Sequence, residues 1–134
     1  MGVDLTSVKG KKGAYFNWTA WRFLLKTAAD YGWVPEGTVL DFSYQYRSAT
    51  RGRKLSELSK ARIKLEIRES CANWAGDYST NHCQLVTADD AGNIQKALLK
   101  ALNDRRFVVD IKSEQTDILI QFTEFLKNGA FRIS

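Results

Sequence analysis

The stretch "AYFNWTAWRFLLKTAADYGW", residues 14–33, contains seven of the chain's sixteen aromatic residues. Asn17 is suited to cap the N-terminus of a helix, and Gly32 followed by Pro35 is a typical helix stop. At about 100° per residue, one face of this helix is apolar. Its members are Trp18, Trp21, Leu24, Leu25, Ala28 and Ala29. We therefore predict that these aromatic residues belong mostly to the core.

Three aromatic positions make this prediction specific. Trp18 and Trp21 should be largely buried and should contact Phe122 and Phe125 of a C-terminal helix. Phe23 lies among the polar positions of the helix. It therefore needs a second partner, which is either another element of this chain or another molecule.

Further helices are indicated by their start signals. Thr87 is a capping residue, and Asp89 and Asp90 favour the positive end of the helix that follows it. A last helix is predicted from Ser113 to Gly129, with a short strand after it. The window 56–72 alternates like a strand but is rich in helix formers, and we favour a helix there.

Strands are predicted elsewhere by period-two alternation, first of all over residues 39–46. Parallel βαβ alternation is absent. We therefore predict an α+β fold dominated by helices, with three or four helices and two or three short strands. At 134 residues, with one proline and nine glycines, we expect a single globular domain, 1–134.

The chain's composition indicates an ordinary globular protein, with 44% hydrophobic and 26% charged residues. No run of 18 apolar residues occurs, so we predict no membrane partner. Two cysteines, Cys71 and Cys83, suit a reducing cytoplasm at least as well as a disulfide, and we expect a cytoplasmic protein with free thiols.

Positive charge is concentrated between residues 47 and 64. This segment has seven basic residues and one acid, Glu57, and we expect its first part, 47–54, to be an exposed loop. The candidate polyanion-binding residues are Arg47, Arg51, Arg53, Lys54, Lys60, Arg62 and Lys64. Tyr44 and Tyr46 lie next to them and are able to stack on bases.

A structural interpretation of the same segment stays open. The charges of Glu57, Glu66 and Glu69 would then neutralise the basic residues, for example through an Arg62–Glu66 pair at i,i+4 spacing. In that case the segment is only a solvated face.

The loop at 74–83 is the second candidate site. Its residues with useful chemistry are Trp74, Asp77, Tyr78, His82 and Cys83. A cysteine and a histidine adjacent in sequence usually point apart, and the spacing does not match a structural zinc site. We predict no metal and no cofactor.

Three blocks, "YFNWTAWRFLL", "VTADDAGNIQKALLKAL" and "FTEFLKNGAFRIS", resemble a group of small bacterial proteins of uncharacterised function. The resemblance covers about half of the chain and implies one soluble bacterial domain, but no activity and no functional residue. Between Val39 and Ala72 this chain departs from the pattern and has a longer insert that includes the basic segment.

These observations predict a non-enzymatic bacterial domain that acts by binding a macromolecule. A polyanion such as nucleic acid, bound by the 47–64 segment, and another protein are the two candidate partners. The alternative is a small enzyme with its site at the 74–83 loop, which would need these side chains to converge in a pocket.

Overall fold

The computed structural model describes residues 1–70, 72, 76–80 and 84–134 of the chain. In this part of the chain, five strands form one antiparallel sheet in the order β2-β1-β5-β4-β3, accompanied by six helices. The α+β class is therefore confirmed, whereas the predicted numbers of helices and strands were too low.

The sheet is assembled from both ends of the chain and its middle. β1 (Gly2–Ser7) pairs with β2 (Gly13–Asn17) on one side and with β5 (Phe131–Ile133) on the other. β4 (Gln84–Val86) lies beside β5, and the two-residue β3 (Val39–Leu40) forms the far edge.

β1 and β2 were missed in the sequence, although ordinary signals for them are present. Val3, Leu5 and Ser7 are buried and alternate with more exposed residues, as expected for a strand with one face on the core. Gly10 lies in the turn that follows, with a positive φ of 75° that favours glycine. Alternation followed by a glycine turn is a β-hairpin signal.

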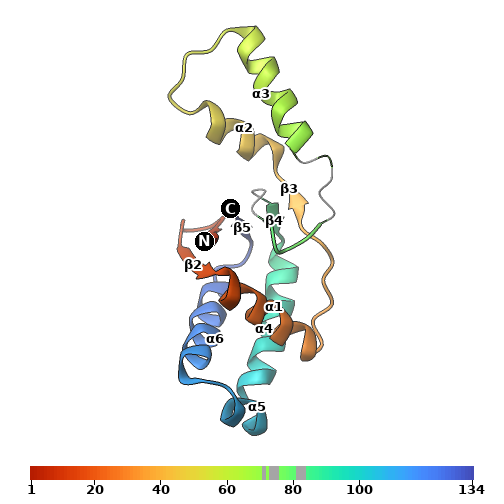
Figure 1. Cartoon of the computed structure of the whole chain (residues 1–134), viewed down its shortest axis with the longest axis vertical. Coiled ribbons are helices and arrows are strands. Elements are labelled where there is room, and N and C mark those ends of the chain that lie inside the picture. The colour runs from red at the N-terminus through yellow and green to blue at the C-terminus, as the bar shows by residue number, and fades with distance from the viewer. Residues whose placement is uncertain (71, 73–75, 81–83) are drawn as a thin grey trace.

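Three helices pack together beneath the sheet, as Figure 1 shows. They are α1 (Trp18–Asp30), α4 (Ala88–Leu102) and α6 (Ser113–Leu126). The short α5 (Arg105–Asp110) connects the last two at the end of the molecule farthest from the sheet.

Both predicted N-caps are confirmed. Asn17 Oδ1 accepts a hydrogen bond from the Ala20 amide at 2.8 Å, and Thr87 Oγ1 accepts one from the Asp90 amide at 3.2 Å. Each of these bonds satisfies a backbone N–H that has no partner inside its own helix.

Trp21 lies at the centre of the core, where its side chain is fully buried. Its ring meets the edge of Phe122 with the centroids 5.4 Å apart, and its Nε1 donates to the Tyr78 carbonyl oxygen at 2.7 Å. The prediction for Trp21 is therefore confirmed. Trp18 is only half-buried and packs at the margin of the same core.

Phe23 finds its partner within this chain. Its ring stacks on Phe107 of α5, with centroids 6.4 Å apart and an interplanar angle of 10°. Tyr31 meets the same ring edge-on, and its hydroxyl donates to Asp104 Oδ2 at 2.5 Å. These contacts join the polar side of α1 to α5.

The strand predicted over residues 39–46 was wrong beyond Leu40. Asp41 caps a helix there, because its Oδ1 accepts from the Tyr44 amide at 3.0 Å, and α2 (Phe42–Thr50) follows. The basic loop expected at 47–54 is accordingly helical as far as Thr50. The short alternation of aromatic residues was outweighed by a cap that starts a helix.

The helix favoured for 56–72 is confirmed as α3 (Glu57–Ser70). It packs against α2, and together they form a hairpin, residues 42–70, that projects from the sheet (Figure 1). Among the side chains that the structure describes, the hairpin contributes none to the buried core. The α2–α3 hairpin is therefore an appendage to a body that packs without it.

Candidate anion-binding surface

The α2–α3 hairpin carries the net charge of the whole protein. Residues 42–70 include eight basic and three acidic side chains, which gives a formal charge of +5, equal to that of the chain. The other residues contain twelve basic and twelve acidic side chains and are balanced. The charge asymmetry seen in the sequence is thus an asymmetry between two parts of the molecule.

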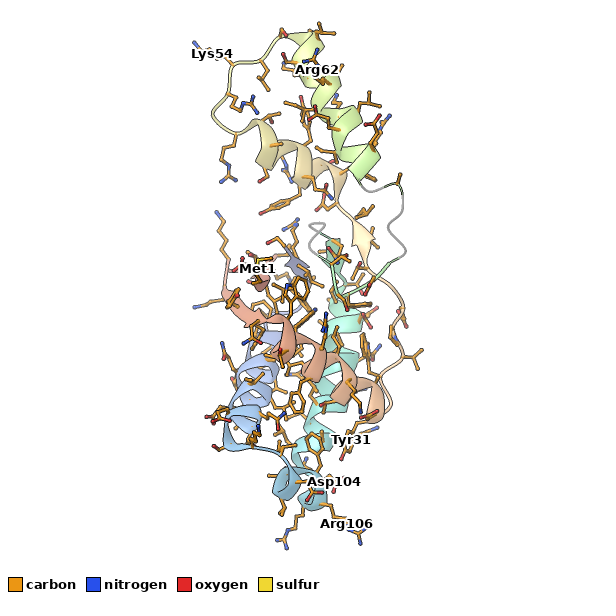
Figure 2. All side chains as sticks on the ribbon, viewed as in Figure 1. Met1, Tyr31, Lys54, Arg62, Asp104 and Arg106 are labelled. Carbon is orange, nitrogen blue, oxygen red and sulfur yellow. The ribbon has the colours of Figure 1, made fainter. Side chains whose placement is uncertain are left out.

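The structure brings the seven predicted basic residues together on this one projecting element. One lies on α2, three in the turn that follows and three on α3. All seven are exposed except Lys60, which is half-buried, and Arg68 of α3 adds an eighth basic group. Figure 2 shows Lys54 and Arg62 at the free end of the hairpin, at the opposite end of the molecule from Asp104 and Arg106.

Few of these charges are neutralised inside the hairpin. Among its described residues one ion pair forms, between Lys60 Nζ and Glu57 Oε1 at 3.3 Å. The pair considered between Arg62 and Glu66 does not form in the part of the chain that the structure describes. An exposed pair of this kind contributes at most about 1 kcal/mol to stability. The hairpin therefore keeps most of its positive charge.

Aromatic rings lie among the basic side chains in space, although they only flank them in the sequence. Lys64 Nζ lies 5.1 Å from the centroid of the Tyr46 ring, and Phe42 is 46% exposed. A pocket of 350 Å³ opens between the two helices. Its lining consists of Phe42, Ser43, Tyr46, Lys64, Ile67 and Arg68.

An ion pair fixes the hairpin to the sheet. Arg132 of β5 donates through Nη2 to Asp41 Oδ2 at 3.0 Å, and its guanidinium lies 4.3 Å from the centroid of the Tyr44 ring. Partial burial acts to raise the pKa of Asp41, but the Tyr44 amide, Arg132 and the nearby charge of Arg47 together lower it below its ordinary value. Asp41 is thus ionised at neutral pH as the cap of α2 and the partner of Arg132.

A second pocket lies beside this ion pair and is called the foot pocket here. It has a volume of 410 Å³ and lies between α2, the β1–β2 turn and β5. Its polar lining consists of Lys11, Tyr44, Arg47, Ser48, Arg51 and Arg132. Sequence reasoning missed Lys11 and Arg132 as site residues. For Arg132 there was a partial signal, because strand alternation turns it away from the buried Phe131 and Ile133.

The alternative site at 74–83 is only partly described. Trp74, His82 and Cys83 lie outside the described residues, as does Cys71, so the predicted free thiols are not placed. Asp77 Oδ1 accepts from the Ser79 amide at 2.8 Å in a turn.

Tyr78, from the same loop, is buried, and its hydroxyl donates to Asp90 Oδ2. Burial, and then the hydrogen bond to Asp90, raise the pKa of Tyr78 well above its ordinary value. Its hydroxyl is therefore protonated at neutral pH and serves as a hydrogen-bond donor inside the core.

No group of three or more histidine, cysteine, aspartate or glutamate side chains in the described part of the chain is arranged to hold a metal ion. None of the described helices has both the length and the apolar character that crossing a membrane requires.

Comparisons with protein-family models, with curated proteins and with solved structures give no match. The resemblance of the three sequence blocks to small bacterial proteins stays a prediction.

Proposed function

We propose that this protein binds nucleic acid through its α2–α3 hairpin. The observation that supports this most strongly is that the hairpin holds the entire net positive charge and contributes nothing to the described core. Eight basic groups gathered on one element repel one another and cost stability, so a folding role does not account for them. A bound polyanion removes that cost.

The hairpin offers the two kinds of contact that single-stranded nucleic acid uses. Exposed arginine and lysine side chains neutralise phosphates, and this contribution dominates affinity that does not depend on sequence. Tyr46 and the exposed Phe42 provide ring faces on which bases stack. The 14 residues of α3 extend about 21 Å, so the helix is long enough to lie along several successive phosphates of one strand.

Fluorescence anisotropy with a labelled single strand of about 20 nucleotides tests the proposal, since such a strand is longer than α3. The test variant combines Arg53→Gln, Lys54→Gln and Arg62→Gln at the free end of the hairpin. The matched control combines Lys96→Gln, Lys100→Gln and Arg105→Gln, which removes three exposed charges from the body.

We expect the hairpin variant to bind much more weakly and the control variant to bind almost like the parent. The parent's log affinity should fall linearly with log salt, by about 0.7 for each contacted phosphate. The proposal is overturned if the parent does not bind at low salt, or if both variants lose affinity equally, which would mean that only net charge matters.

A protein partner is the second candidate, and one observation favours it. Leu58 and Leu65 on α3 are 73% and 55% exposed, and their spacing of seven residues places them on one face. A photo-crosslinking residue at position 65 should then give one discrete protein adduct in cells. The same residue in place of Leu99, an exposed leucine of α4, is the control.

As part of the same proposal we place the protein in the cytoplasm of a bacterium. Two cysteines in a domain of this size are compatible with a reducing compartment. Labelling of both thiols by a blocking reagent without prior reduction tests this placement.

A further inference from the structure

The foot pocket contains more positive charge than its surroundings balance. Four of its lining side chains are basic, and they come from three separate parts of the chain: Lys11, Arg47, Arg51 and Arg132. Asp41, the carboxylate that pairs with Arg132, also accepts a hydrogen bond from the Tyr44 amide. In the described residues, Lys11 and Arg51 form no ion pair.

Arg132 is held in place before any ligand arrives. Its Nε and Nη2 both donate to Asp41 Oδ2, at 3.3 and 3.0 Å, and the Tyr44 ring supports the flat side of the guanidinium. Within the described structure, Nη1 has no acceptor, and the side chain is 18% exposed. A guanidinium fixed on one edge can donate from the other with little loss of conformational entropy.

We propose that the foot pocket binds one backbone phosphate of the nucleic-acid strand, so that the strand continues from the hairpin onto the sheet. This inference rests on the proposed function. It extends the anion-binding surface to Lys11 and Arg132, two residues outside the basic segment and 121 positions apart in the sequence.

The pocket's donors match a phosphate better than a carboxylate. Arginine forks pair with phosphate oxygens through two N–H groups at once, and Lys11 adds a point charge from the turn opposite. The Ser48 hydroxyl also lines the pocket and has no acceptor among the described residues. Donors on several sides suit an anion whose oxygens point in several directions.

The test compares Lys11→Gln with Lys12→Gln in the anisotropy titration used for the hairpin. Both residues lie in the same turn and are exposed, and both changes remove one charge, but Lys12 does not line the pocket. We expect about a tenfold loss of affinity for Lys11→Gln, as for one charge-assisted hydrogen bond. For Lys12→Gln we expect less than about a twofold loss, because salt screens an exposed charge that makes no contact.

A second measurement follows the guanidinium signals of Arg51 and Arg132 by NMR as the strand is added. We expect both to shift in the parent protein, and Arg132→Lys, which keeps the charge but loses the fork, to bind more weakly. The far-ultraviolet circular dichroism of this variant shows whether its fold is retained.

The outcomes separate this inference from the proposed function. If the parent binds and the hairpin variant does not, but Lys11→Gln and Lys12→Gln behave alike, the foot pocket is not a phosphate site although the hairpin still binds nucleic acid. Guanidinium signals that do not shift when the strand is added would likewise show that the foot pocket is not a phosphate site. A polyglutamate peptide of equal charge that displaces the strand equally well would overturn the assignment to phosphate.

Discussion

Asp90 is almost completely buried in the first turn of α4, where the sequence predicted only a favourable charge near the helix N-terminus. One of its carboxylate oxygens accepts from Trp33 Nε1 at 2.9 Å, and the other accepts from the Tyr78 hydroxyl. The carboxylate thus joins two distant aromatic residues to α4, a role that no local pattern indicates.

Asp90→Asn should therefore destabilise the protein by about 1.5–3 kcal/mol, the contribution of a hydrogen bond to a charged group. The amide keeps one acceptor and directs an NH₂ group at the other donor. Urea unfolding followed by tryptophan fluorescence measures the change. The control is Asp89→Asn, an exposed neighbour in the same first turn of α4. Equal losses for the two variants would contradict a special role for Asp90.

Tyr31 and Asp104 form a titratable pair at the opposite end of the molecule from the hairpin. The hydrogen bond to Asp104, with smaller contributions from burial and negative charge, raises the pKa of Tyr31 from 10.0 to about 12. The same hydrogen bond lowers the pKa of Asp104. The pair is therefore most favourable when Tyr31 is protonated and Asp104 is ionised.

The stabilising effect of this pair has a defined pH window. Since the pKa of Tyr31 is raised on folding, its contribution is complete below pH 10 and disappears as the pH rises toward about 12. Since the pKa of Asp104 is lowered, its contribution disappears as the pH falls through the acidic range. NMR titration of the tyrosine rings should show Tyr31 near 12, and Asp104→Asn should return it toward 10; an unchanged value would exclude Asp104 as the cause.

At the scale of elements, the α2–α3 hairpin and the body are physically distinct. Replacing residues 42–70 by a short Gly-Ser linker should leave the body folded, because every described core residue lies outside the hairpin. We expect a thermal midpoint within about 5 °C of the parent, a change equivalent to roughly 1 kcal/mol. The near-ultraviolet circular dichroism of the buried tryptophans should be retained.

Nucleic-acid binding should be lost in the same deletion variant. A variant that fails to unfold cooperatively would show that the hairpin supports the body after all. A variant that folds and still binds would move the binding surface to the body and contradict the proposed function.

At the scale of the whole molecule, local stability should differ between the hairpin and the body. The α2–α3 contact is made by half-buried side chains, whereas α1, α4 and α6 share fully buried ones such as Trp21, Ile94 and Phe122. Amide hydrogen exchange should therefore be much faster in α2 and α3 than in the three core helices. Uniform protection across all helices would show that the molecule opens as one unit.

Features that depend on neighbouring residues could be predicted from the order of residues alone. Caps at Asn17 and Thr87 and the helical state of 57–70 follow from residue types a few positions apart, and each was predicted. The apolar face predicted for α1 was confirmed only in part, because Trp21, Leu24 and Ala28 are buried whereas Ala29 is exposed. The concentration of charge between 47 and 64 is also a linear property, so the order of residues alone reveals it.

The pairing of distant groups, in contrast, is visible only in the folded molecule. Asp41 and Arg132 are 91 residues apart, and Trp33 and Asp90 are 57 apart, so no short window contains either pair. The sheet likewise joins β1 to β5 across the whole chain. Such contacts are selected by the fit of whole surfaces and by the burial of a core whose members lie far apart in the sequence, and a local pattern carries no information about its distant partner.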